Sequence, residues 1–412
     1  MKLLLIKAGK AWHTLKRDGL LRGGKRVLGA FLALFKFVGK GDILFVTGGV
    51  GDSARYRCHH VAEELELNGF KCSITVQDNP LLASYADKFA VFVFHRVLYT
   101  PSVAKLIARI KEQGKEIIFE TDDLVYDKEF LVHMDYFQKM NPLEKKLYEN
   151  GVGGEILADP YVKVCTTTTS FLADKLREKG KKVFLVPNKL SSADLEVVQK
   201  LKDSQVYQVD KDNSGQIQDS RFKTQDSVKI AYFSGTLSHN KDFATVADAL
   251  KEVLEKHPQA ELFLAGPLDA GSKLSAFGSR IRQIPYAPRS EHFANIASVD
   301  INIAPLEIGN PFCEAKSELK FFEAGIMGVP TVAAATRPFR EAIEDGVDGF
   351  VADGTKEWVE KLEKLISDAS LRKEMGEKAR LKALARYSTP NAKNGEYYEY
   401  LRKSIKAQGA SL

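Results

Sequence analysis

From Gly41 onward, short runs of β-branched and aromatic residues alternate with stretches that have the apolar spacing of helices. The alternation occurs twice, before and after a polar stretch between Ser191 and Ser227. Strands that alternate with helices form parallel sheets with crossover helices on their faces. The sequence therefore predicts an α/β chain with two Rossmann-like, doubly wound parallel-sheet domains that face a cleft.

Each expected domain contains five strands. In the first half we expect strands at Ile43–Thr47, Cys72–Val76, Ala90–Phe94, Glu116–Glu120 and Val183–Val186. In the second half we expect strands at Val228–Phe233, Glu261–Ala265, Arg282–Ile284, Asp300–Ala304 and Thr331–Ala334. The expected parts of the chain are a basic amphipathic segment (1–40), an N-terminal domain (41–189), a polar linker or excursion (190–227), a C-terminal domain (228–388) and a helix that returns to the N-terminal domain (389–412).

The net charge of +6 is unevenly distributed along the chain. Residues 1–40 hold ten Lys and Arg against one acid, Asp18, so this segment carries +9 and the remainder sums to 6 − 9 = −3. The main body therefore has no positive excess for a polyanion, and we expect no nucleic-acid partner.

The basic segment also contains many apolar residues. Two short helices broken at Gly23-Gly24 would each have an apolar and a basic face, a pattern typical of a segment that lies on an anionic membrane. Alternatively, Phe31, Leu34 and Phe35 pack on the protein's own surface while the lysines are solvated.

The four cysteines stand far apart and form neither a CxxC pair nor a metal-ligand spacing with His. The natural interpretation is a cytoplasmic protein whose cysteines are reduced. No apolar run reaches the roughly 18 to 20 residues that cross a bilayer. We therefore expect a peripheral protein on the cytoplasmic face of the membrane.

Candidate residues for catalysis and acceptor binding follow the first strands. A glycine-rich turn after Ile43–Thr47 leads into a helix, where backbone amides and the helix N-terminus favour a sugar or an anion. The acceptor-binding candidates are Gly49, Gly51, Arg55, Tyr56, Arg57 and, after the third strand, Arg96. His95, Asp122 and Asp123 stand at neighbouring strand ends and are candidate catalytic groups. Alternatively, the glycine turn serves only packing, and Arg96 and the aspartates form a supporting ion pair; we expect no metal there.

A second group of candidates lies in the second half. Gly235 followed by Lys241 suits a diphosphate, which the amide approaches and the ammonium neutralises. Lys316, Lys320 and Glu323 are spaced to share one face of a helix and would meet a phosphate and then a ribose diol. The alternative is a surface charge ladder, which the apolar residues around these positions disfavour.

These motifs resemble those of the large family of retaining glycosyltransferases with the GT-B fold. The resemblance rests on Phe322–Val332 (FEAGIMGVPTV), on the loop from Gly235 to Lys241 and on Asp345–Val351 (DGVDGFV), and it covers roughly residues 42 to 390. It is strongest to bacterial members that build surface polysaccharides, which have counterparts of Glu120–Leu124 and Ala315–Lys320.

The resemblance implies transfer of a hexosyl group from a nucleoside-diphosphate sugar to a glycan or lipid-linked glycan acceptor, with retention and without a metal or other cofactor. It implies that Glu323 holds the ribose hydroxyls and that Lys241 and Lys320 bind the diphosphate and stabilise the leaving group. The further donor-binding candidates are Gly235, Thr236, Glu314, Lys316 and Ser317.

Two positions depart from the family pattern. Thr236 stands where the family commonly has Arg, so Lys316 or Lys320 would supply that charge. Glu314 is one residue away from the usual spacing of the paired glutamates, which leaves the donor sugar unidentified. Two rival functions therefore stay open: a nonhydrolysing sugar-nucleotide epimerase, and an inactive carbohydrate-binding scaffold of the same fold.

Overall fold

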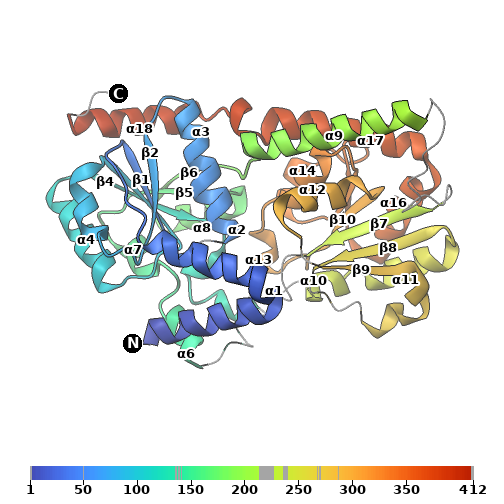
Figure 1. The fold of residues 1–412 in the computed structure, drawn as a ribbon, viewed down its shortest axis with the longest axis horizontal. Helices are drawn as coiled ribbons and strands as arrows, with labels where there is room; N and C mark the ends of the chain where they lie inside the picture. Colours follow the sequence, from blue (N-terminus) through green and yellow to red (C-terminus); the bar gives the residue numbers. More distant parts are fainter. Residues whose placement is uncertain are drawn as a thin grey trace. The chain divides into compact units, whose positions relative to one another are not determined.

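The computed structural model describes residues 2–49, 51–134, 137, 140, 142–212, 227–234, 240–266, 268, 271–285 and 287–409. The chain divides into two compact units, Met1–Lys189 with Lys393–Leu412, and Leu190–Ala392 (Figure 1). Each unit contains a six-stranded parallel sheet. The predicted α/β fold class is therefore confirmed.

The sheet of the first unit has the strand order β2-β1-β3-β4-β5-β6. Its strands are β1 (Ile43–Thr47), β2 (Cys72–Val76), β3 (Val91–His95), β4 (Glu116–Thr121), β5 (Val164–Thr167) and β6 (Lys182–Leu185). The order reverses between β1 and β3, and doubly wound sheets bind ligands at the carboxyl ends of strands beside such a switch point.

The first unit also contains a series of helices besides its N-terminal segment. They are α2 (Asp52–Ala54) continued by a π-helical turn (Arg55–His60), α3 (Val61–Leu67), α4 (Pro101–Glu112), α6 (Pro142–Lys145), α7 (Gly154–Ala158), α8 (Ser170–Glu178) and α18 (Gly395–Ala407). Helix α18 comes from the end of the chain, and Tyr397, Leu401 and Ile405 are buried in the same apolar cluster as the strand residues Phe45 and Ile118. The C-terminal helix is thus part of the first unit.

The sheet of the second unit has the order β12-β11-β10-β7-β8-β9. Its strands are β7 (Val228–Phe233), β8 (Ala260–Ala265), β9 (Ile281–Ile284), β10 (Ile301–Ala304), β11 (Thr331–Ala334) and β12 (Phe350–Ala352). Its helices are α9 (Ser192–Asp212), α10 (Asn240–Ala244), α11 (Ala247–Lys256), α12 (Arg289–Ala297), α13 (Pro311–Glu314), α14 (Leu319–Ile326), α15 (Arg337–Ala342), α16 (Gly354–Ser367) and α17 (Ala369–Arg386). Here the order reverses between β7 and β10.

Helix α9 occupies much of the stretch that we expected to be a polar linker. Its first turn has a reciprocal cap, because the amide of Asp194 donates to Ser191 Oγ and the amide of Ser191 donates to Asp194 Oδ2, both at 3.1 Å. Val198 is buried on one side of the helix. A capped first turn and one packed side are sufficient to hold a helix in a polar sequence. Residues 213–226 of the expected linker lie outside the described residues.

The N-terminal segment forms helix α1 (Lys2–Leu34), drawn in dark blue in Figure 1. We expected its break at Gly23-Gly24, but the helical conformation is interrupted at Gly19, whose φ is +76°. Such a φ is readily available only to glycine, whereas Gly23 and Gly24 keep helical geometry. No described helix is both long and apolar enough to cross a membrane.

Candidate active site

The candidate donor site of the second unit lies beside the switch point between β7 and β10. Lys320, in the first turn of α14, is half-buried, and its Nζ lies 5.7 Å from the ring centre of Tyr232 on β7. Its backbone oxygen accepts a hydrogen bond of 3.1 Å from Asn302 on β10. Within the described parts of the chain, the ammonium of Lys320 has no hydrogen-bond or ion-pair partner.

The environment of Lys320 disfavours its charged form. Burial lowers the pKa of Lys320, and the neighbouring Lys316 lowers it further, while Asp242 and Glu323 act in the opposite direction. A desolvated cation without a partner is stabilised by an incoming anion. This position is therefore suited to a phosphate group.

Lys316 has a different environment from the one we expected. We predicted that it shares a helix face with Lys320 and Glu323, but α14 begins at Leu319, so Lys316 precedes the helix. Its Nζ forms an ion pair of 2.8 Å with Asp242 Oδ2, and Asp242 also accepts a hydrogen bond of 3.2 Å from the Cys313 thiol. Asp242, which sequence reasoning missed, thus neutralises Lys316, whereas Lys320 has no such carboxylate partner among the described residues.

Glu323 lies one turn after Lys320 and is buried. Its Oε1 contacts Arg289 Nη1, and its Oε2 lies 3.2 Å from His292 Nε2. Arg289 also donates to both carboxylate oxygens of Asp194, from Nε at 2.8 Å and from Nη2 at 3.1 Å. Helices α9, α12 and α14 are therefore joined by a chain of buried carboxylates around one guanidinium.

None of Asp194, Arg289 and His292 was among the candidates. The spacing of Arg289 and His292 in α12 was a usable signal, because residues at i and i+3 share a helix face. Asp194 lies far from both in the sequence, and no local pattern pairs it with them.

The remaining donor-site candidates are Lys241, Glu314, Ser317, Gly235 and Thr236. Lys241 is exposed on α10. Glu314 is engaged by the backbone, because its Oε1 accepts from the Gly309 amide at 3.1 Å and its Oε2 from the Arg337 amide at 2.8 Å. Ser317 lies half-buried in the turn between α13 and α14. Gly235 and Thr236 lie outside the described residues, so their roles stay predictions.

The candidate acceptor site of the first unit lies at the carboxyl ends of β1, β3 and β4, beside the β1/β3 switch point. Ser53 Oγ is 2.9 Å from His95 Nε2 and donates to Asp122 Oδ2 at 2.7 Å. His95 Nδ1 lies 3.2 Å from Thr47 Oγ1. The structure thus brings together His95 and Asp122, as the strand ends predicted, and adds Ser53, which was not a candidate.

Arg96 completes this cluster from the end of β3. Its Nε lies 2.6 Å from Asp122 Oδ1 and its Nη2 lies 3.3 Å from Asp123 Oδ2. Arg96 is the one non-glycine residue with positive φ, +50°, in the described part of the chain. A backbone strained in this way is retained where the surroundings fix it, and such positions are common at functional sites.

These contacts limit what the two aspartates can do. Burial would raise the pKa of Asp122, but Arg96 and the hydrogen bonds from His95 and Ser53 outweigh it and hold the pKa well below its usual range. Asp123 Oδ1 accepts a hydrogen bond from the Leu124 amide. Asp122 is therefore a weak base, and the cluster is better suited to orienting a hydroxyl group than to removing its proton.

The glycine-rich turn and its helix are only partly available to a ligand. Gly49 and Gly51 are exposed, and Arg55 forms a partly exposed ion pair of 3.0 Å with Asp52. Tyr56 and Arg57 are buried, which disfavours contact with an acceptor at the surface, and their role in acceptor binding stays a prediction. Arg57 instead forms a two-point contact with the buried Glu120, at 2.7 and 2.9 Å, in the interior of the unit.

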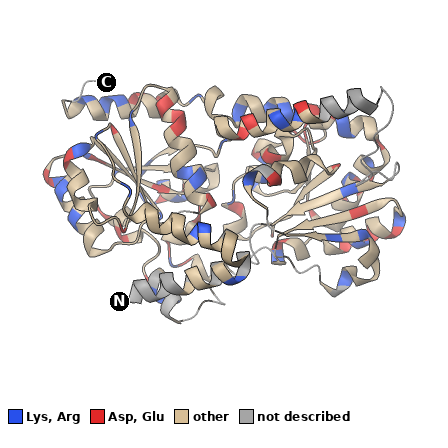
Figure 2. Ribbon diagram, viewed as in Figure 1, with Lys and Arg blue, Asp and Glu red and all other residues tan. Residues whose placement is uncertain are grey.

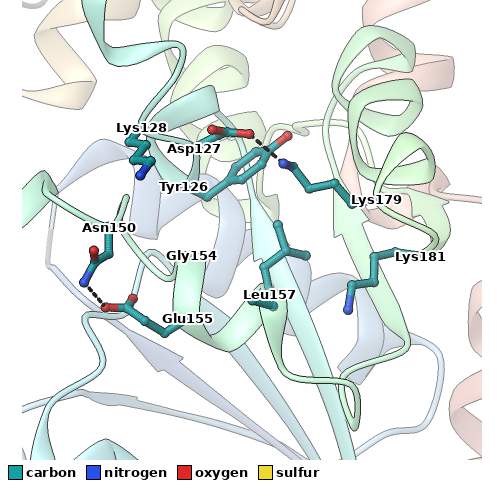
Figure 3. Close-up of a pocket in the computed structure, with 10 residues that line it drawn as sticks. Tyr126, Asp127, Lys128, Asn150, Gly154, Glu155, Leu157, Lys179 and Lys181 are labelled. Atoms are coloured by element: carbon teal, nitrogen blue, oxygen red, sulfur yellow. Dashed lines mark hydrogen bonds and ion pairs between the residues drawn. The ribbon is translucent and has the colours of Figure 1, made fainter.

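A separate cavity of about 460 Å³ opens on the first unit (Figure 3). Its walls come from the segment after β4, from α7 and from the turn between α8 and β6, and none of the predicted site residues lines it. Figure 3 shows Lys179 paired with Asp127 at 2.6 Å and Asn150 donating to Glu155 at 3.1 Å.

In the described part of the chain, no three His, Cys, Asp or Glu side chains group as a metal site.

Comparison with known proteins bears on the family and the fold. Residues 228–368, most of the second unit, match a family model described as glycosyl transferases group 1. No curated protein matches the chain.

Among solved structures, a glycosyltransferase from Rickettsia africae is similar with a TM-score of 0.59 and 15% identity, over 89% of this chain and 100% of that one. Sucrose-phosphate synthase from Thermosynechococcus elongatus is similar with a TM-score of 0.57 and 12% identity, over 89% and 98%. Anabaena HepE in complex with UDP and glucose is similar with a TM-score of 0.56 and 13% identity, over 88% and 100%. These likenesses show the fold, which is that of GT-B glycosyltransferases.

Proposed function

We propose that this protein is a glycosyltransferase, which moves a hexosyl group from a nucleoside-diphosphate sugar to a glycan or lipid-linked glycan acceptor. The main support is the environment of Lys320 at the start of α14 beside the β7/β10 switch point: among the described residues its ammonium has no hydrogen-bond or ion-pair partner, and burial lowers its pKa. Glu323, one helical turn further along, presents a carboxylate that suits a ribose diol. A phosphate subsite followed by a diol subsite matches the donor half of a sugar nucleotide.

The reaction requires stabilisation of the diphosphate that leaves as the anomeric carbon becomes oxocarbenium-like. Lys320 would supply a positive charge at the place where negative charge develops, and Lys241, which is exposed on α10, would add a second one. The α14 N-terminus contributes partial positive charge in the same region. We propose that these groups suffice without a metal, and that the anomeric configuration is retained.

The acceptor hydroxyl would bind at the cluster of Ser53, His95, Arg96, Asp122 and Asp123 in the first unit. Ser53 is partly exposed and bridges His95 and Asp122, so it is the group best placed to exchange its hydrogen bonds with an incoming hydroxyl. We further propose that the acceptor belongs to bacterial surface-polysaccharide synthesis and that the reaction takes place on the cytoplasmic side, where the four free cysteines stay reduced.

The decisive experiment incubates the full chain with a panel of sugar nucleotides, with and without glycan acceptors, and measures release of nucleoside diphosphate. UDP-glucose is the first donor to test, because the similar HepE has been solved with UDP-glucose. A transferase releases the diphosphate only with an acceptor, whereas an epimerase changes the sugar alone and a scaffold does neither. Thermal shift with the same panel reports donor binding, since a ligand that binds the folded state raises its stability.

Lys320→Ala tests the assignment within that assay. We expect it to lower kcat by about a hundredfold, the scale of losing one group that stabilises transition-state charge. Lys364→Ala is the matched control, because Lys364 is an exposed lysine of the same unit paired only with Glu360 on α16. Unchanged turnover and donor affinity in Lys320→Ala would refute the proposed role.

A further inference from the structure

The second half of α1 presents three distinct faces. At 100° per residue, the exposed apolar side chains fall within an arc of about 120°. They are Leu20, Leu21, Leu28, Phe31 and Leu32, each 56–85% exposed. A separate arc of about 60° holds Gly23, Val27, Ala30 and Leu34, which are buried or half-buried, while the small residues Gly24 and Ala33 are half-buried outside this arc. The exposed cations Lys25 and Arg26 lie between the ends of these arcs.

The exposed arc is therefore not the side by which α1 packs on its own unit. Phe31 and Phe35 contact each other at 5.3 Å between ring centres, yet they remain 56% and 60% exposed. This finding decides against the alternative that these two rings pack on the protein surface. Eight of the fifteen exposed large hydrophobic side chains in the described part of the chain stand between Trp12 and Phe37. An apolar surface of this concentration marks an interaction site.

Charge indicates which partner covers this surface. Residues 1–40 carry +9, whereas the rest of the chain sums to −3. A second copy seated on the same face would bring two such basic segments together, which is unfavourable. An anionic lipid surface would accommodate the apolar arc among its acyl chains and the flanking cations among its headgroups. Figure 2 shows this second half of α1 in tan interrupted by blue.

The helix is also connected to the body of the first unit. Asn79 Nδ2 donates to the Lys36 carbonyl at 3.0 Å, Lys88 Nζ donates to the Val38 carbonyl at 3.3 Å, and Val38 is buried. A membrane contact made by α1 would therefore hold the unit that contains the acceptor cluster. We propose that the face formed by Leu20, Leu21, Leu28, Phe31 and Leu32, with Lys25 and Arg26, docks the protein on an anionic bilayer surface without crossing it.

The test uses the purified full chain and vesicles of phosphatidylcholine, alone or with about one-third phosphatidylglycerol, whose negative headgroups attract basic residues. We expect sedimentation only with the anionic vesicles, weakened by salt. Tryptophan emission gives a second readout, because Trp358 is 3% exposed and Trp12 is 71% exposed. A blue shift on adding anionic vesicles would then come from Trp12 as it leaves water.

Two double variants and their controls locate the surface. Phe31→Ser with Leu32→Ser, and Lys25→Glu with Arg26→Glu, should each weaken vesicle binding about tenfold or more. Leu381→Ser and Lys403→Glu alter exposed residues elsewhere and should bind like the parent. Absence of binding to anionic vesicles, or binding that the Phe31/Leu32 change leaves intact, would overturn the proposal. The proposal would also be overturned if the protein does not bind vesicles but forms a dimer that the Phe31/Leu32 change dissociates. Sedimentation needs no transfer reaction, so this outcome is independent of the proposed function.

Discussion

The guanidinium of Arg289 contacts the carboxylate of Glu323, so the residue that we expect to hold the ribose is already paired with a cation. Asp194 engages two other nitrogens of the same guanidinium and fixes its orientation. Arg289 therefore acts as a positioning residue: its guanidinium places a counter-charge against the buried carboxylate of Glu323 and fixes the orientation of that carboxylate.

Arg289→Met should raise the donor KM about tenfold with a smaller change in kcat, because Glu323 would lose a charge-assisted contact worth roughly 1.5–3 kcal/mol. Steady-state kinetics with a saturating acceptor separates the two constants. Arg282→Met is a suitable control, because Arg282 is an exposed cation near Glu261 in the same unit. A fall in kcat with unchanged KM would show that Arg289 acts on the reacting groups instead.

The lowered pKa of Lys320 predicts a pH dependence of the reaction. The ammonium is needed in its charged form, and its pKa in the free protein lies below the ordinary value of about 10.4. The value of kcat/KM should therefore fall as the pH rises through this lowered pKa, at a less alkaline pH than an unperturbed lysine would allow. Lys320→Arg, which stays charged, should remove this alkaline fall even if its activity is low; persistence of the fall would assign it to another group.

Ser53→Ala should affect the acceptor and not the donor. The hydroxyl bridges His95 and Asp122 in the first unit, whereas the donor residues belong to the second. We expect the acceptor KM to rise several-fold, with donor affinity unchanged in a thermal-shift titration. Ser84→Ala, which alters a surface hydroxyl on the same unit, should leave both constants unchanged. Equal loss of donor binding in Ser53→Ala would contradict the division of the two sites.

Gly48→Ala should destabilise the first unit and displace Arg96. A β-carbon at Gly48 would lie 1.9 Å from the Arg96 carbonyl oxygen, so the turn after β1 or the strained Arg96 must move. Overpacking of this kind costs about 1–3 kcal/mol or more. Gly49→Ala is a closely matched control, because a β-carbon there meets nothing within 4 Å. Thermal unfolding measures the stability of both variants. Equal stability would show that the turn accommodates the added β-carbon without a loss of folding free energy.

Arg57→Met should be among the most destabilising changes in the chain. It leaves the buried Glu120 carboxylate without its counter-charge, which typically costs about 3–5 kcal/mol. Arg55→Met, two residues earlier, removes a partly exposed pair with Asp52 and should cost less than about 1 kcal/mol. Urea unfolding measures both, and adding Glu120→Gln to Arg57→Met should recover part of the loss. A small effect of Arg57→Met alone would mean that Glu120 finds another partner.

The fold class, and the strand ends at which several candidate residues stand, could be predicted from the sequence alone. Alternating strand and helix patterns are local, with periods of about 2 and 3.6 residues, so they are readable from neighbouring residues alone. His95 and Asp122 could be selected in this way, because parallel strands bring their carboxyl ends to one edge of a sheet. Lys320 and Glu323 were selected by their spacing along one helix and by the family resemblance.

The tertiary structure decided which of these side chains are available and what each one contacts. Arg57 is buried because Glu120 lies opposite it. Arg289 bridges Asp194 and Glu323, and these three residues come from three separate helices. The side of α1 that is left exposed likewise depends on packing against the first unit. Crossover connections place residues side by side that are 30 to 100 positions apart, a separation over which no local period carries information.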